Sequence, residues 1–270
     1  EYGRAIDMFS HNESYKCDSL STARFDVFDE LVNYESIFTK IENASNIPAY
    51  EITPSYSDRR SNRTVKADSI DELLECIKML SEVPNEKFVF AYCDNPDSIL
   101  HKYGTSSEEA KNFLLDAENK ICNLCSSLDN DTLLIISTDH GHKDIKNVYS
   151  LLDYPQIQEC LIMPPSIESR SVTFWVKEDM KNIFEDKFNK FFGNDFWLMT
   201  KKEFLDKHFL GFGVKHPKID DFIGNYMALS TGSSIIPLET YLAEPKKIKK
   251  STHCGLSKEE MEVPLIVIKK

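Results

Sequence analysis

No apolar stretch in the 270-residue sequence approaches the about 20 residues that a membrane helix needs. The sequence also shows no internal repeat, no low-complexity tract and no signal peptide at its start. Apolar residues make up 41% of it and charged residues 28%, which is enough apolar material for a sizeable core. These features exclude intrinsic disorder and collagen-like assembly, and they predict a folded protein without a membrane partner.

Positive charge is also scarce. The chain has 32 Lys and Arg against 44 Asp and Glu, so its formal net charge is −12. The one dense basic run, Lys246 to Lys250, is too short to offset this. Because a protein that binds a nucleic-acid polymer is expected to carry the opposite sign, that class of partner is excluded. A small anionic substrate remains compatible with the charge if a bound metal supplies local positive charge.

Paired cysteines are the third absence. Of the seven cysteines, Cys122 and Cys125 alone lie close in sequence, and no second pair stands at zinc-ribbon spacing. The pattern favours reduced thiols in a cytoplasmic protein. A redox pair is the weaker alternative, because these two cysteines lie inside a helical pattern and not at a helix start. Since the first residue is Glu1 and not Met, we expect a processed or truncated start.

Two apolar strands flank a long helix in the first half of the sequence. Residues 87–93 and 131–137 are nearly continuous apolar runs, which predict strands buried on both faces. Residues 107–128 between them show helical periodicity, with Ser106 or Ser107 as N-cap. This arrangement predicts an α/β fold with a mostly parallel sheet flanked by helices. Upstream, the patterns predict a helix at 32–41, a turn at 53–55 and a helix at 69–80.

Residues 158–245 have a different pattern and are predicted to form a small α+β insertion. It would contain strands at 160–163, 172–176 and 196–199 and helices at 180–192 and 202–208, with a core that includes Phe174, Trp175, Phe192 and Trp197. The chain would return through strands at 226–230 and 263–268. The predicted organisation is therefore a core of residues 1–157 and 246–270 with an insertion at 158–245.

Three histidine-bearing clusters lie beside predicted strands, where ligands gather in α/β proteins. In the first, Asp97 and His101 are four residues apart, so both side chains face one side of a helical turn. Alone, this pair is better explained as a helix cap with a surface histidine. The second cluster, Asp139-His140-Gly141, follows the strand at 131–137 directly and suits a sharp turn that directs both side chains to one point. His142 next to it is either a neighbour of that site or exposed.

The third cluster surrounds His253 in a polar loop before the last strand, and it gains meaning from the other two. Together the clusters supply two carboxylates and three imidazoles. Oxygen and imidazole ligands without thiolate suit Zn²⁺ or Mn²⁺. Two such cations would clamp a phosphoryl group from both sides and offset the acidic charge of the protein.

The clusters also share their order and strand context with a known superfamily. The segment 87–92 precedes Pro96-Asp97-x-x-x-His101-x-x-Gly104, the strand at 131–137 precedes Asp139-His140-Gly141, and His253-Cys-Gly-Leu-Ser precedes Glu260-Met-x-Val-Pro-Leu-Ile266. With these motifs the chain resembles the alkaline-phosphatase superfamily, most closely its type I phosphodiesterase/nucleotide pyrophosphatase branch. The resemblance covers residues 85–142 and 250–268.

The resemblance implies a two-metal site and a reaction. Asp97, His101 and His253 would hold one zinc ion, and Asp139 and His140 the second. In the family, a further aspartate after the first strand completes the second site. A Thr or Ser between the metals attacks phosphorus, and water releases the covalent intermediate. The implied function is metal-dependent hydrolysis of small phosphodiesters or nucleotide pyrophosphates.

One departure from the family pattern is serious. Upstream of Asp97 there is no apolar strand ending in aspartate and no matching nucleophile segment. Thr53-Pro-Ser-Tyr56 resembles the nucleophile loop superficially, but it lacks that preceding strand and is interpreted as a turn. We therefore expect Glu1 to lie inside the catalytic domain, whose N-terminal part this chain would lack. A non-catalytic metal-binding protein, or a phosphomonoesterase or phosphomutase of the same superfamily, is the alternative.

Three further residues have weaker interpretations. Arg170 is expected to pair with an acid, and His216 to begin a turn. Cys254 stands where many relatives have Gly, and its thiol is either tolerated or a weak extra metal ligand. The patterns leave the substrate, the metal and the oligomeric state open.

Overall fold

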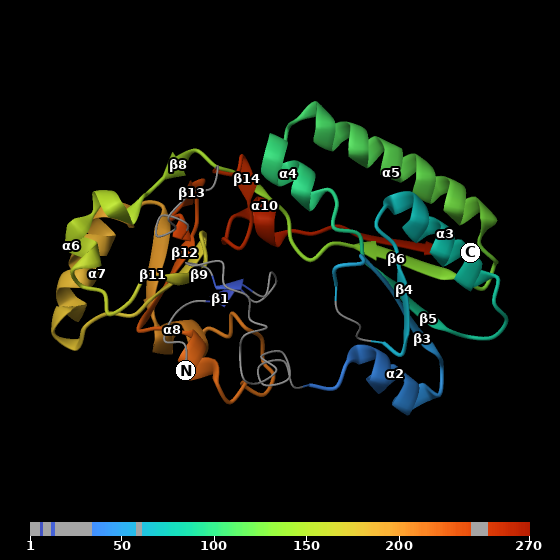
Figure 1. Cartoon of the computed structure of the whole chain (residues 1–270), viewed down its shortest axis with the longest axis horizontal. Helices are drawn as coiled ribbons and strands as arrows, with labels where there is room; N and C mark the ends of the chain where they lie inside the picture. Colours follow the sequence, from blue (N-terminus) through green and yellow to red (C-terminus); the bar gives the residue numbers. More distant parts are fainter. Residues whose placement is uncertain (1–5, 8–11, 14–33, 58–60, 239–247) are drawn as a thin grey trace. The chain divides into compact units, whose positions relative to one another are not determined.

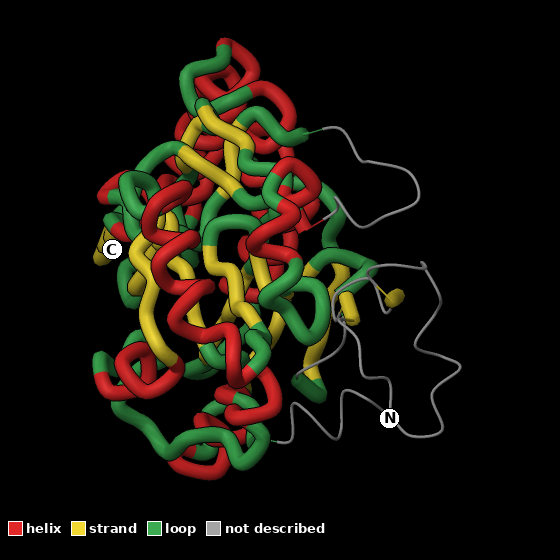
Figure 2. Tube along the Cα trace, turned by 90° about the vertical axis from the view of Figure 1, so that its left-hand side faces the viewer, coloured by secondary structure: helices red, strands yellow, loops and turns green. Residues whose placement is uncertain are grey.

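The computed structural model describes residues 6–7, 12–13, 34–57, 61–238 and 248–270 (Figure 1). The chain divides into two compact units. Unit 1 contains Glu1–Leu31 and Asp139–Val263, and unit 2 contains Val32–Thr138 and Pro264–Lys270. The insertion predicted at 158–245 stays a prediction. Helices and strands both occur throughout the described chain, as Figure 2 shows, so the α/β class is confirmed.

Unit 2 contains a three-stranded parallel sheet with the order β4-β3-β5. Its strands are β3 (Ala49–Thr53), β4 (Arg63–Lys66) and β5 (Phe88–Ala91). Ile52 on β3 is fully buried and packs in one cluster with Ala67 and Leu73. β5 confirms the strand predicted at 87–93. The predicted burial on both faces is wrong, because Phe90 is 44% exposed.

Serine caps fix the starts of three helices of unit 2. The Ser69 side chain accepts a hydrogen bond from the backbone N–H of Glu72 and begins α3 (Ile70–Ser81), and Ser107 does the same for α5 (Glu108–Ser127). Both predicted helices are confirmed to within about a residue. The helix predicted at 32–41 begins later, as α2 (Ile37–Ser45), because Ser36 caps it. Residues 32 and 33 lie outside the described part.

The remaining strands of unit 2, β6 (Leu133–Ser137) and β15 (Leu265–Lys269), pair with each other in antiparallel fashion. The prediction that β6 joins β5 in one parallel sheet is not met within the described residues. Burial on both faces is also wrong for β6, since Ile135 is 57% exposed and its partner Val267 is 56% exposed. Residues directly opposite in such a pair share a face, so these two strands present one apolar face to solvent.

Unit 1 is built on an antiparallel sheet with the order β11-β12-β10-β9. Its strands are β9 (Ser166–Glu168), β10 (Ser171–Phe174), β11 (Phe196–Thr200) and β12 (Tyr226–Ser230). The helix α7 (Lys181–Phe192) places Phe184, Phe188 and Phe192 on one face by its 3.6-residue period, and all three are fully buried. Phe174 packs against Phe184 and Phe188 at ring-centroid distances of 5.3 and 5.5 Å.

The structure changes several predicted details of this region. Residues 160–163 form a turn with one isolated bridge between Leu161 and Val176, not a strand. Trp197 is 42% exposed and was wrongly predicted to be core, because it occupies the outer face of β11. The other elements of unit 1 are short: β1 (Ile6–Asp7), β2 (Asn12–Glu13), β8 (Asn147–Val148), β13 (Ser234–Ile235), α6 (Pro155–Gln158), α8 (Lys201–Asp206), α9 (Ile219–Phe222) and two 3-10 turns, Leu151–Asp153 and Glu178–Met180.

Candidate metal centre

In unit 2, the helix α4 (Asp97–Tyr103) brings the first predicted pair together. Asp97 is its first residue and His101 lies one turn later, with 3.4 Å between the Asp97 Oδ2 and the His101 Nε2. No side chain caps the start of the helix. The carboxylate of Asp97 at this end interacts favourably with the positive end of the helix dipole. The predicted juxtaposition is therefore confirmed, and both side chains are partly exposed.

In unit 1, the Asp139-His140-Gly141 segment forms the predicted turn. The Gly141 N–H donates to the Glu260 carbonyl at 2.9 Å. A Cβ at position 141 would lie 1.9 Å from the Glu259 carbonyl oxygen, so glycine is required by the close approach of the two backbones. This contact holds the turn beside α10 (Lys258–Met261) and brings the second and third clusters together.

A two-residue ladder positions the next histidine. The strands β7 (Lys143–Asp144) and β14 (Ser251–Thr252) pair in antiparallel fashion, with Thr252 opposite Lys143. Extending this register by one residue sets His253 opposite His142. The ladder therefore explains why two histidines more than 100 residues apart in the sequence meet at one point.

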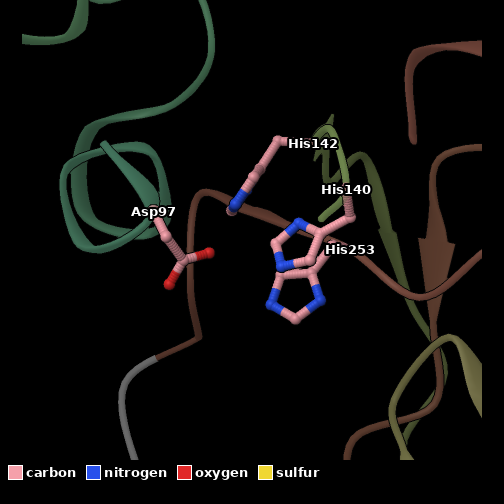
Figure 3. A group of neighbouring side chains, drawn as sticks. All are labelled: Asp97, His140, His142 and His253. Carbon is pink, nitrogen blue, oxygen red and sulfur yellow. The ribbon is translucent and has the colours of Figure 1, made fainter. Parts of the chain in front are cut away.

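The rings of His140, His142 and His253 form a compact cluster, which we call the histidine cluster (Figure 3). The His140 and His253 rings are stacked with centroids 3.8 Å apart. His142 lies 5.5 Å from the first and 5.2 Å from the second. One ring nitrogen of each histidine lies within 4.8 Å of those of the other two.

Each of these rings has a contact at its Nδ1 atom. The His140 Nδ1–H faces the carbonyl of Gly141 at 3.1 Å, which fixes the proton on that nitrogen because a carbonyl can only accept. The His142 Nδ1 lies 3.0 Å from the Ser251 Oγ, and the His253 Nδ1 lies 3.0 Å from the Cys254 Sγ. The pattern assigns Nε2 as the atom by which each ring would bind a metal.

A buried ion pair supports the loop that carries His253. Arg170 is fully buried, and its Nη2 donates to the Glu260 Oε2 at 2.6 Å while its Nε donates to Oε1 at 2.5 Å. The same carboxylate accepts from the Gly255 N–H at 2.8 Å and from the Ser257 hydroxyl at 2.6 Å. The prediction that Arg170 pairs with an acid is confirmed.

This ion pair determines the titration of Glu260. Burial alone would raise the pKa of the Glu260 carboxyl, but hydrogen bonds from Arg170 and Ser257, together with the Arg170 charge, outweigh burial and lower the pKa. Next to it, a hydrogen bond from the Lys143 ammonium lowers the pKa of Glu259 and joins β7 to α10. Both carboxyls are therefore ionised at neutral pH.

Cys254 has a left-handed backbone with φ of 77°. That conformation favours glycine, the residue that the family resemblance leads one to expect there. Although Cys254 as a residue is exposed, the loss of water around its thiol raises the pKa of Cys254 to about 12, with further contributions from Glu168 and Glu260. The thiol is therefore protonated at neutral pH in the metal-free chain.

The donor set of unit 1 fits a transition metal. Three imidazoles and the nearby Asp139 carboxylate are ligands that Zn²⁺ accepts, and no thiolate is needed. The sequence analysis predicts Asp139, His140 and His253 as ligands, which stays a prediction, and it gives His142 no firm role. The sequence did offer one signal for His142, because His140 and His142 flank Gly141. Ser251 had no signal, because its contact depends on the ladder register.

The other weaker candidates are now placed. The His216 Nδ1 accepts from the Lys218 N–H in a turn, as predicted. Cys122 and Cys125 are free cysteines, and the described residues contain no disulfide. Among the helices of the described residues, none has both the length and the apolar composition to cross a membrane.

Comparison with solved structures defines the class of fold. The chain is similar to murine ectonucleotide pyrophosphatase/phosphodiesterase 5, solved as an inactive variant in complex with AMP, with 16% identity and a TM-score of 0.64. That match covers 93% of this chain and 67% of the murine one. Phosphonoacetate hydrolase from Sinorhizobium meliloti, in complex with phosphonoformate, matches with 15% identity and a TM-score of 0.58, over 86% of this chain and 67% of that one. The fold is therefore alkaline-phosphatase-like.

The family follows from the sequence. The model of the type I phosphodiesterase/nucleotide pyrophosphatase family matches residues 29–189, which is more than half of the chain. The chain belongs to this family of phosphoester hydrolases. No curated protein sequence matches it.

Proposed function

We propose that this chain is a metal-dependent hydrolase of phosphodiesters or nucleotide pyrophosphates. The observation that carries the proposal is the family match together with the meeting of Asp139, His140 and His253 at one turn of unit 1. As the family resemblance implies, Asp97, His101 and His253 would hold one divalent cation, and Asp139 and His140 the second. Zinc is the proposed metal, and manganese is the alternative.

The residues of unit 1 suit this task before any metal binds. The Nδ1 contacts of His140 and His253 fix both rings with Nε2 as the ligand atom. The Arg170–Glu260 pair holds the loop after His253 through Gly255 and Ser257. Little reorganisation is therefore needed when a cation binds. When bound, such cations polarise a phosphoryl oxygen and neutralise charge that develops on it.

The substrate class is proposed from charge and from the relatives. With a net charge of −12, the chain needs bound cations to attract an anionic substrate. The murine structure was solved with AMP and the bacterial one with phosphonoformate. Small nucleotides or phosphoesters are therefore the proposed substrates, and a cytoplasmic location stays a prediction from the cysteines.

The alternative is a metal-binding member of the fold that does not catalyse. It is favoured by one observation, which is that no Thr or Ser with the family's nucleophile context was found before Asp97. In the structure, Thr53 ends β3 and the Ser55 hydroxyl donates to the Asp68 carboxylate at 2.6 Å, as in an ordinary turn. This supports the interpretation of that segment as structural.

A chelation experiment tests the proposed function. The metal-loaded protein is expected to hydrolyse bis(p-nitrophenyl) phosphate, to lose this activity on thorough chelation, and to regain it with Zn²⁺. p-Nitrophenyl phosphate serves as the monoester comparison. Activity that survives chelation contradicts the proposal. Metal binding without hydrolysis of either ester supports the non-catalytic alternative, and preference for the monoester supports a phosphomonoesterase.

Ligand variants test the proposed residues. Asp139→Ala and His253→Ala are each expected to lower the bound metal measured by elemental analysis after dialysis. His216→Ala is the matched control, because His216 is exposed and lies in the turn at 216–218. If both variants keep the metal content of the parent protein, the ligand assignment is wrong.

A further inference from the structure

His142 is a third histidine at the proposed metal centre, and the family resemblance gives it no role. It is only 7% exposed, which makes it the most buried ring of the histidine cluster. Its Nδ1 faces the hydroxyl of Ser251, which is itself fully buried.

We infer that His142 is a direct metal ligand through Nε2 and that Ser251 is the residue that orients it. His142 would then join His253, its neighbour across the β7–β14 ladder, on the cation proposed for that histidine. This inference deepens the proposed function and rests on it in sharing the ligand His253. It concerns metal binding alone and does not require that the chain hydrolyse a substrate.

Three observations support the inference independently. First, His142 has a contact at Nδ1, with the Ser251 hydroxyl, as His140 has with a carbonyl and His253 with a thiol, so Nε2 is the ligand atom in each ring. Second, the β7–β14 register sets His142 opposite His253. Third, the ring nitrogens of the cluster lie within 4.8 Å of one another.

Ser251 acts as a positioning residue. With a metal on Nε2, the neutral imidazole of His142 carries its proton on Nδ1 and donates it to the Ser251 Oγ. Ser251 lies on β14 two residues before His253. The same short segment therefore orients one ligand, His142, and carries another, His253. The pairing of β7 with β14 therefore fixes the positions of His142 and His253 relative to each other.

A third imidazole also sets the choice of metal. Imidazole nitrogen suits zinc, whereas carboxylate and water oxygen suit manganese. Adding the His142 imidazole to the site therefore shifts selection toward zinc. The inference predicts that His142 raises the preference of the protein for Zn²⁺ over Mn²⁺, which a purely structural histidine would not do.

Equilibrium dialysis of His142→Gln and Ser251→Ala against Zn²⁺ and Mn²⁺ tests this. His142→Gln should lower Zn²⁺ affinity by about 100-fold or more and reduce the Zn²⁺/Mn²⁺ preference. Ser251→Ala should lower Zn²⁺ affinity by about 10-fold, as loss of an orienting partner does. His216→Gln is the matched control and should leave both metals unaffected. Parent-like Zn²⁺ affinity and preference in a folded His142→Gln protein overturns the inference.

A second measurement avoids the variants, in case His142→Gln does not fold. In the parent protein with ¹⁵N-labelled imidazoles, Zn²⁺ should shift the Nε2 resonance of His142 at the same stoichiometry as that of His253. If Zn²⁺ shifts the His253 resonance and leaves His142 unchanged, His142 is not a ligand. Hydrolysis assays are separate, so zinc bound by His142 in an inactive protein refutes the proposed function and leaves this inference standing.

Discussion

The two units hold their candidate ligands in different ways. In unit 1, the histidine cluster rests on buried groups, namely the Arg170–Glu260 pair, the Ser251 hydroxyl and the Gly141 contact. In unit 2, Asp97 and His101 lie on a seven-residue helix that has no side-chain cap and no buried residue. Preorganised ligands lose little freedom on binding a metal, whereas exposed ones must be ordered by it. Unit 1 should therefore determine affinity.

The largest effect that tests this contrast is expected for Glu260→Ala. The change leaves the buried Arg170 charge without its carboxylate, and breaking a buried pair in this way typically lowers stability by about 3–5 kcal/mol. Urea unfolding followed by tryptophan fluorescence reports on unit 1, because Trp175 and Trp197 both lie there. Glu262→Ala removes an exposed partner of Lys258 and is the control, with little expected change.

Gly141→Ala should give the next largest effect. The new Cβ would overlap the Glu259 carbonyl oxygen at 1.9 Å, so the turn must move away from α10. We expect a loss of about 1–3 kcal/mol in stability and a lower affinity for Zn²⁺. Gly213→Ala is the control, because no atom lies within 4 Å of a Cβ at that position. Equal effects of the two changes would contradict the role given to Gly141.

Acid should weaken unit 1 through Glu260. The pKa of this carboxyl is lowered in the folded chain, so the folded state binds its proton less readily than the unfolded state. Its contribution to stability is therefore complete above the usual glutamate pKa of about 4.3 and is lost as the pH falls through the lowered folded value. Unfolding free energies measured from neutral pH into this acidic range should fall more steeply for the parent protein than for Glu260→Gln.

Asp97→Ala should have the smallest effect on stability. The residue is partly exposed and contributes through the start of α4, which is worth about 0.3–1 kcal/mol. Metal content should nevertheless fall, because the carboxylate is a proposed ligand. Thermal unfolding followed by circular dichroism, with elemental analysis of the same samples, measures both. Loss of stability as large as that of Glu260→Ala would remove the contrast between the units.

Local signals in the sequence were enough for much of this fold. Ser107 was predictable as a cap because a cap and its helix are adjacent in the chain. The turn at Asp139-His140-Gly141 was predictable for the same reason, since its residues are adjacent in the chain. The apolar run at 226–230 also became the strand β12 as predicted.

Features that depend on distant partners could not be predicted. Arg170 and Glu260 are 90 residues apart, and no local sequence pattern around either residue indicates the other as its partner. Ser251 contacts His142 across 109 residues, through a ladder only two residues long. The exposure of Ile135 was missed for a related reason. An apolar run predicts a strand, whereas burial depends on which elements cover it.

The apolar face of β6 and β15 has a practical consequence for the behaviour of the chain in solution. Leu133, Ile135, Leu265 and Val267 are each at least 56% exposed on neighbouring strands, and exposed apolar patches of this kind promote self-association. Colloidal stability should therefore be limited by this face and not by the acidic remainder of the surface. The substitution Ile135→Lys would add a charge at an exposed position and would remove little buried surface. Light scattering measured against protein concentration would show whether it reduces aggregation.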